Sequence, residues 1–229
     1  EAVGTGAFAI ANVRLERHGA PSTPCADHRT RSVTPEPLQE AWATAWWLPR
    51  HQKKLDELRA HREAGRRVRL LFVGDSITEG WEKEGRAVFQ RRYAPLNAVA
   101  LGFGGDRTEN LLWRLQNGEI DGVDPQAVVM MIGTNNTGER QEAPALVAAG
   151  VQRNLEEIRR RLPRARVLLL GIFPRGAGPD DALRRINERI NPLLAPLADG
   201  QRVVYQDIGA ALMNADGTLS PEVMPDGLH

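Results

Sequence analysis

Three residues of this chain have the side chains that an acyl-transfer reaction needs. Ser76 follows an apolar run at 68–73, and Asp226 and His229 stand three apart in PDGLH at 225–229. In serine esterases a hydroxyl attacks the ester, an imidazole takes its proton, and a carboxylate fixes the imidazole tautomer. The sequence therefore predicts Ser76 as nucleophile, His229 as base and Asp226 as the carboxylate that orients it.

Two further segments supply groups for an oxyanion hole. LGFGGDRT at 101–108 and IGTNN at 132–136 each follow an apolar run. Hydrogen-bond donors must converge on the oxygen that becomes negative in the transition state. We expect these donors to be the backbone N–H groups of Ser76 and Gly105 and the side-chain amide of Asn135. A glycine suits the middle position because its backbone approaches a ligand closely.

Each of these features alone also has a simpler interpretation. Asp75 or Ser76 is a typical cap of a helix that follows a strand, and Asn135 is a common turn residue. Asp226 with His229 is equally compatible with a surface turn. The four segments taken together favour the catalytic interpretation, and we then expect Asp75 and Trp81 to contact the substrate.

The segment after the second apolar run has two other possible roles. Asp106 followed by Glu109 resembles a capping arrangement for a helix that ends near Gly118. GFGG resembles part of a dinucleotide-binding loop, but Arg107 stands where that motif needs its third glycine. The sequence therefore predicts helix capping and no dinucleotide cofactor.

The elements that must position these residues alternate between strands and helices. Short apolar runs that predict strands lie at 68–73, 97–101, 127–132, 166–172 and 202–205. Apolar residues at helical spacing predict helices over 147–162 and 183–197, the second kinked or split by Pro192. Another helix is expected over 38–64, interrupted near Pro49. Strands alternating with helices predict an α/β fold with a five-stranded parallel sheet, whose strand ends bring the candidate residues to one edge.

Composition excludes several classes of function. Thirty basic residues against 29 acidic ones leave a formal charge of +1, which gives no basis for nucleic-acid binding. No apolar run approaches the roughly 20 residues that span a membrane. Cys25 is the only cysteine, and the histidines show no metal-ligand spacing, so we expect neither a metal nor a cofactor.

The first 36 residues differ from the rest of the chain. GAFAIANVRLERHG alternates as one strand would, and the segment up to residue 36 is loop-like. We expect residues 1–36 to be an extension on the surface of a domain at 37–229, with the remnant of an upstream β domain as the alternative. The chain begins with Glu1 and lacks a basic leader segment, as a processed or trimmed product does. A secreted or periplasmic location is expected ahead of a cytoplasmic one.

Four segments of the sequence together resemble those of the SGNH hydrolases, the GDSL-like esterase superfamily. They are GDSITEGW, GFGGDRTENLLWRLQNGE, GTNN and DGLH. The branch they are most similar to includes platelet-activating-factor acetylhydrolase catalytic subunits and bacterial carbohydrate acetylesterases, and WWLPRHQKKLDEL also looks like that branch. The resemblance covers about residues 42–229. In the family the chain continues past the histidine into a helix, whereas this sequence ends at His229.

The resemblance implies a flavodoxin-like three-layer α/β/α fold and no cofactor or metal. The family's nucleophile falls on Ser76, its oxyanion residues on Gly105 and Asn135, and its acid and base on Asp226 and His229. The expected function is hydrolysis of small acyl esters, chiefly acetyl groups on a carbohydrate. A lysophospholipase or thioesterase acting on lipid acyl chains is one alternative, and a non-catalytic carbohydrate-binding domain is another. The oligomeric state is open, with a homodimer as one expectation.

Overall fold

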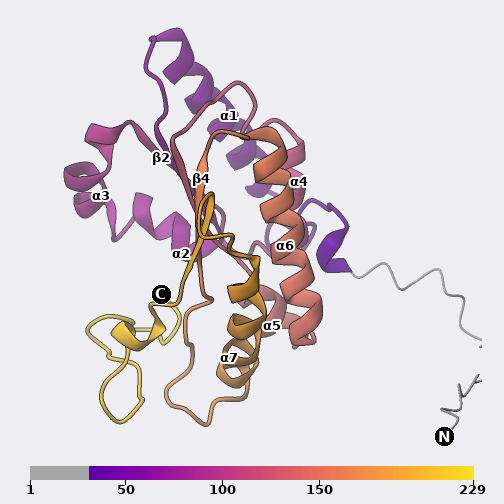
Figure 1. Cartoon of the computed structure of the whole chain (residues 1–229), viewed down its shortest axis with the longest axis vertical. Coiled ribbons are helices and arrows are strands. Elements are labelled where there is room, and N and C mark those ends of the chain that lie inside the picture. Colours follow the sequence, from indigo (N-terminus) through magenta and orange to yellow (C-terminus); the bar gives the residue numbers. More distant parts are fainter. Residues whose placement is uncertain (1–30) are drawn as a thin grey trace, which may run out of the picture.

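The computed structural model describes residues 31–229 and contains a five-stranded parallel sheet (Figure 1). The strands are β1 (Leu70–Gly74), β2 (Ala98–Gly102), β3 (Ala127–Met131), β4 (Arg166–Leu170) and β5 (Val203–Gln206). Their order across the sheet is β2-β1-β3-β4-β5. This is the order of flavodoxin-like folds, in which ligands bind beyond the carboxyl end of β1 where the chain reverses direction across the sheet. The predicted five-stranded parallel sheet is confirmed.

Helices lie on both faces of the sheet. They are α1 (Trp47–Glu63), α2 (Ser76–Glu79), α3 (Arg86–Arg92), α4 (Thr108–Gln116), α5 (Thr134–Arg140), α6 (Pro144–Arg161) and α7 (Ala182–Leu194). In Figure 1 α2 and α3 lie on one side of the strands, and α4, α6 and α7 lie on the other. The three-layer α/β/α architecture is therefore confirmed.

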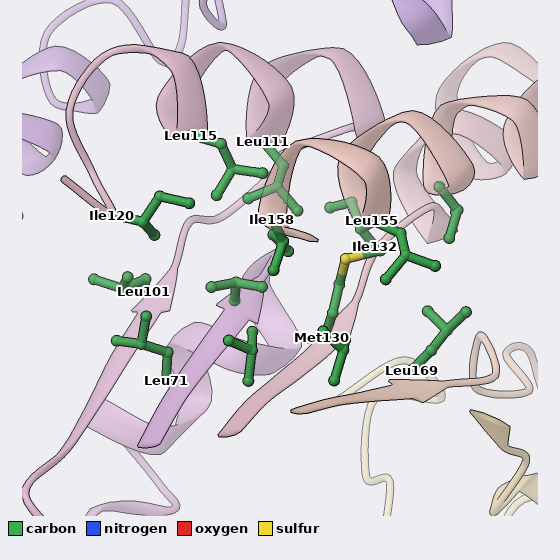
Figure 2. Packing of buried hydrophobic residues seen from close by; sticks show 14 of the residues in the cluster. Leu71, Leu101, Leu111, Leu115, Ile120, Met130, Ile132, Leu155, Ile158 and Leu169 are labelled. Carbon is green, nitrogen blue, oxygen red and sulfur yellow. The ribbon is translucent and has the colours of Figure 1, made fainter. Parts of the chain in front are cut away.

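One face of the sheet carries the main hydrophobic core. Inward residues of the strands, such as Leu71, Leu101 and Met130, pack against Leu111 of α4 and Ile158 of α6 (Figure 2). All five side chains are almost completely buried. Each removes apolar surface from water, which stabilises the fold by about 1.5–3 kcal/mol per fully buried side chain.

The opposite face is covered over β1 and β2. Phe72 of β1 packs against Phe89 of α3 and against Tyr93, with ring centroids 5.8 Å and 5.0 Å apart. On the same face of the sheet, Val204 of β5 is exposed. This second core therefore covers β1 and β2, whereas β5 at the opposite edge of the sheet is left exposed on this face.

The helix boundaries differ from the predicted ones at two prolines. The helix expected over 38–64 begins only at Trp47, so Pro49 lies in its first turn, where a missing N–H costs nothing. Residues 41–46 form turns instead. Pro192 does not split the helix expected over 183–197: α7 runs through it to Leu194 and then tightens into a 3-10 turn.

The predicted capping role of Asp106 and Glu109 is wrong. The helix α4 begins at Thr108, and the N–H of Arg107 donates to Asn110 Oδ1 at 2.9 Å. Asn136 also accepts from the Thr108 N–H at 3.0 Å. Asp106 is fully buried and bonded to other groups, which the next section describes.

The end of the predicted N-terminal extension packs on the sheet domain. Thr108 Oγ1 donates to the carbonyl of Ser32 at 3.0 Å, and the Glu36 N–H donates to the carbonyl of Glu109 at 3.2 Å. The strand predicted in GAFAIANVRLERHG lies outside the described residues. The boundary at residue 36 stays a prediction.

The short helix α2 begins immediately after β1 because Asp75 caps it. Asp75 Oδ1 accepts a hydrogen bond from the Ile77 N–H at 3.0 Å. The residue is completely buried, and its Oδ2 atom has no hydrogen-bond partner among residues 31–229. This burial raises the pKa of Asp75 to about 7, although the hydrogen bond from Ile77 acts to lower it.

We predict that Asp75→Asn removes a pH dependence of stability. With an ordinary pKa of 3.8 when unfolded and about 7 when folded, Asp75 binds its proton more tightly in the folded state. The free energy of unfolding of the wild type therefore falls as pH rises between these values, by at most roughly 4 kcal/mol. The asparagine stays neutral and still accepts from Ile77.

Urea unfolding of both proteins at about pH 4.5 and pH 8 measures this difference. The variant should gain stability relative to the wild type as pH rises. Stability curves that run parallel over this range would contradict the buried, titrating Asp75.

Candidate active site

Ser76, His229 and Asp226 form one hydrogen-bonded chain in the structure. His229 Nε2 lies 2.8 Å from Ser76 Oγ, and His229 Nδ1 lies 2.6 Å from Asp226 Oδ2. Ser76 is the first residue of α2, and the histidine comes from the far end of the sequence. If Nδ1 carries the proton that Asp226 accepts, Nε2 is free to accept the proton of the serine hydroxyl.

A turn holds the carboxylate of Asp226 against the imidazole. Asp226 Oδ1 accepts from the backbone N–H groups of Leu228 and His229 at 2.9 Å and 2.6 Å. Partial burial acts to raise the pKa of Asp226, but the hydrogen bonds from the His229 ring and these backbone groups hold it at about 2. Asp226 is therefore a carboxylate throughout the neutral range.

This turn is exposed and is attached to the loop that follows β4. The side chains of Asp226 and His229 are 54% and 42% exposed. The N–H of Gly176, in the loop before α7, donates to the carbonyl of Gly227 at 2.9 Å. Met224 is buried just before the turn, and its carbonyl accepts a hydrogen bond from the Gly227 N–H at 3.0 Å.

The three groups expected to donate to an oxygen anion each have an N–H that makes no hydrogen bond in the described part of the chain. The N–H of Ser76 belongs to the first turn of α2, where no intrahelical acceptor exists. Gly105 has a φ of +74°, and within residues 31–229 its N–H makes no hydrogen bond. Asn135 Nδ2 donates to the carbonyl of Asp106 at 2.9 Å, which uses one of its two protons and leaves the other available.

A fully buried arginine that the sequence did not identify fixes these loops. Arg114 of α4 donates to the carbonyl of Gly74 at 3.1 Å and to Asp106 Oδ2 at 2.7 Å. Its guanidinium also bonds Glu119 and lies 3.9 Å from the ring centre of Phe103. Arg114 follows the buried Leu111 by three residues, which places both on the same face of the helix. This spacing is the one feature of the sequence that indicates that Arg114 faces the core.

Two more contacts support the loop of Gly105. Trp47 Nε1 donates to Asp106 Oδ1 at 2.6 Å, so both carboxylate oxygens of Asp106 are bonded. Glu79 of α2 accepts from the Gly104 N–H at 2.6 Å. This bond leaves the N–H of Gly105, and not that of Gly104, for a ligand.

Asp75 and Trp81 were predicted to contact the substrate. Asp75 directly precedes Ser76 in the chain, but it is completely buried and has no exposed surface to offer a substrate. Trp81 packs between Phe72 and Tyr93, at centroid distances of 5.7 Å and 5.4 Å. It borders a cleft of about 630 Å³ along the outer edge of β2, and Ser76, Gly105, Asn135, Asp226 and His229 do not line that cleft.

The described part of the chain shows neither a metal-binding cluster nor a membrane-spanning helix. Within residues 31–229 no three His, Cys, Asp or Glu side chains gather where they could hold a metal ion. None of the helices in this range has the length and apolar character needed to cross a membrane.

Comparison with known proteins gives a family match over most of the chain. Residues 72–229 match the model of the GDSL-like Lipase/Acylhydrolase family. The chain is also similar to platelet-activating factor acetylhydrolase IB subunit alpha1 of Homo sapiens. The two are 33% identical over 196 residues, which cover 85% of this chain and 80% of that protein.

Solved structures share the fold. A GDSL-like lipase from Bacteroides thetaiotaomicron superposes with a TM-score of 0.58 at 20% identity, over 76% of this chain and 88% of that one. A carbohydrate acetylesterase from Sinorhizobium meliloti gives a TM-score of 0.54 at 19% identity, over 70% and 89% of the two chains.

The sequence resemblance to GDSL-like esterases is thus confirmed by the family match and by the shared fold. Acylhydrolases of this kind cleave esters of small molecules. The chain belongs to the GDSL-like lipase/acylhydrolase family and is an ester hydrolase.

Proposed function

We propose that this chain is a serine esterase that removes acetyl and other small acyl groups from the hydroxyls of a carbohydrate. The observation that carries the proposal is the 2.8 Å approach of His229 Nε2 to Ser76 Oγ, with Asp226 bonded to the other ring nitrogen. A hydroxyl is a weak nucleophile until an adjacent base accepts its proton.

In the proposed mechanism Ser76 Oγ attacks the ester carbonyl while its proton moves to His229 Nε2. The ionised Asp226 stabilises the imidazolium that forms. The alcohol then leaves with the proton from His229, and the acyl group remains on Ser76. Water attacks this acyl-enzyme with His229 again as base, which releases the acid and restores the serine.

The negative oxygen of the tetrahedral intermediate needs donors that are already in place. The N–H groups of Ser76 and Gly105 and the free amide proton of Asn135 are proposed for this role. Each donor of this kind typically contributes about 3–4 kcal/mol to the transition state. The Glu79, Arg114 and Asp106 contacts limit how far these donors can move.

The chemistry of the neighbouring loops favours a short acyl group and a polar alcohol. Within 102–108 and 133–136 only Gly104, Gly105 and Asn135 keep partly exposed surface, and none of the three carries an apolar side chain. A long acyl chain would need an apolar groove to gain about 0.8 kcal/mol per buried methylene. The relatives at 33% identity are named acetylhydrolases, which also supports acetyl as the acyl group.

A second candidate substrate is the ester of a lipid. It is favoured by the name of the same relatives, platelet-activating factor acetylhydrolase. The acyl group would again be short, and the two candidates differ in the alcohol part of the ester.

We predict that Ser76→Ala abolishes ester hydrolysis and leaves the fold intact. Removing the nucleophile of such a system commonly lowers turnover by about 10⁶-fold. Hydrolysis of an acetyl ester and urea unfolding measure the two effects. Thr44→Ala is the control, because it removes an exposed hydroxyl that donates only to the Ala41 carbonyl. Retention of more than about one hundredth of the wild-type rate would exclude Ser76 as nucleophile.

The rate should rise with pH from acid to neutral, because a general base accepts the serine proton only in its unprotonated form. Asp226 should add no dependence of its own in this range, since its pKa is held at about 2 and its carboxylate is already ionised. A profile of kcat/KM against pH tests this expectation. A rate that increases toward acid would contradict the assignment of Asp226 and His229.

Two variants, Asp226→Asn and Asp216→Asn, test whether the effect on turnover is specific to the carboxylate of Asp226. Asp226→Asn should lower kcat by about 10³–10⁴-fold, because the imidazole loses its orienting acceptor. Asp216→Asn should change it little, since the Asp216 side chain accepts from Thr218 in its own turn. Equal effects of the two substitutions would argue against the proposed role.

Catalytic efficiency should fall steeply as the acyl chain lengthens. Acetyl, butyryl, octanoyl and palmitoyl esters of one alcohol provide the comparison. We expect a steep decrease after butyryl, because the exposed residues of loops 102–108 and 133–136 carry no apolar side chain against which a long chain could bury its methylenes. An efficiency that climbs to octanoyl or beyond would overturn the acetylesterase proposal in favour of long-chain lipid esters.

A further inference from the structure

The ring of Trp42 lies directly against the glycine proposed for the oxyanion hole. A Cβ atom built on Gly105 would lie only 2.3 Å from Trp42 Cη2. A Cβ atom built on Gly104 would lie 3.7 Å from Cη2 of Trp46. The two indole rings, 6.0 Å apart and inclined by 31°, therefore line one side of this loop.

Trp42 is more exposed to solvent than a residue of the hydrophobic core. It is 52% exposed, whereas the neighbouring Trp47 is completely buried. Isolated exposed apolar residues are common and need no special explanation. Trp42 differs because its exposed ring adjoins Gly105, where the reacting ester carbonyl would bind.

The segment that carries Trp42 is fixed in place. Leu38 and Ala43 on either side are buried, and Trp46 Nε1 donates to the Trp42 carbonyl at 3.1 Å. Arg107 bonds Glu40 in the same segment. A rigid aromatic ring offers contact area to a ligand at a small cost in conformational entropy.

Polar groups border the aromatic pair. Arg107, two residues after Gly105, bonds the carboxylates of both Glu40 and Glu139. These carboxylates are 29% and 40% exposed, so their outer lone pairs can accept hydrogen bonds from a ligand. An apolar surface bordered by acceptors matches a sugar ring, which has a face of C–H groups and an edge of hydroxyl donors.

We propose that Trp42 and Trp46 form a subsite for the sugar ring of the ester's alcohol part, with Trp42 as the specificity-determining residue. The inference rests on the proposed esterase function and names its substrate class. An acetyl group is too small to use two indole rings. The exposed ring of Trp42, with Trp46 beside it, offers a rigid flat surface, which suits the broad face of a pyranose better than a flexible acyl chain.

The test compares Trp42→Ala and Trp42→Phe on two acetyl esters, an acetylated xylopyranoside and ethyl acetate. For Trp42→Ala, kcat/KM on the xylopyranoside should fall by about tenfold or more, mainly through a higher KM. The loss on ethyl acetate should stay below about threefold. Trp42→Phe should retain most of the activity on the sugar ester. Leu193→Ala, which shortens an exposed apolar side chain of α7, is the control.

Binding is measured separately in the Ser76→Ala background, by calorimetry with the same acetylated xylopyranoside. Adding Trp42→Ala should weaken this binding by about the same factor as it raises KM. If the wild type cleaves neither ester, the proposed function fails, and this binding measurement alone decides whether the subsite exists.

Three results would overturn the subsite. Equal losses on both esters would mean that Trp42 only supports the oxyanion loop. New activity on octanoyl esters would place its ring at the acyl group. Unchanged activity on the sugar ester and unchanged calorimetric binding would show that Trp42 does not contact the sugar.

Discussion

The site depends on one buried cation. The guanidinium of Arg114 is completely shielded from water, where an unpaired charge would be strongly destabilising. Asp106 and Glu119 neutralise it, and the carbonyls of Gly74 and Leu101 accept its remaining protons. Because these carbonyls belong to β1 and β2, the same side chain joins the ends of two strands to the loop after β2. Removing the guanidinium would leave the buried carboxyl groups of Asp106 and Glu119 without their charge partner.

The two halves of the candidate site are therefore built differently. Ser76, Gly105 and Asn135 stand on strand ends and helix starts that the buried network of Arg114 holds together. Asp226 and His229 instead occupy an exposed turn, fixed by local hydrogen bonds and by the contact between Gly176 and Gly227. The groups proposed to stabilise charge are thus rigidly supported, whereas the proposed proton acceptor, His229, contacts Ser76 from an exposed turn.

The sequence predicted the sheet because its strands are short apolar runs, which local pattern detects well. It selected Ser76 and His229 from their side-chain types beside the predicted strands, and the family motifs supported the same choice. The contact between these two residues, 153 positions apart, is shown only by the structure. Arg114 was missed because a charge on a helix is normally solvated, and its burial arises from Asp106 and Glu119. Trp42 was predicted to lie in a helix. The helix begins only at the buried Trp47, so Trp42 lies in the turns before it, with its ring against Gly105. The location of the protein stays a prediction.

The most direct test of the account is the covalent reactivity of Ser76. Diisopropyl fluorophosphate phosphorylates a serine hydroxyl only when a neighbouring base activates it, and fluoride leaves. Mass spectrometry of the treated native protein should find one adduct, on the peptide that contains Ser76, and none after prior denaturation or in His229→Ala. An unmodified native protein, or an adduct on another residue, would contradict the account.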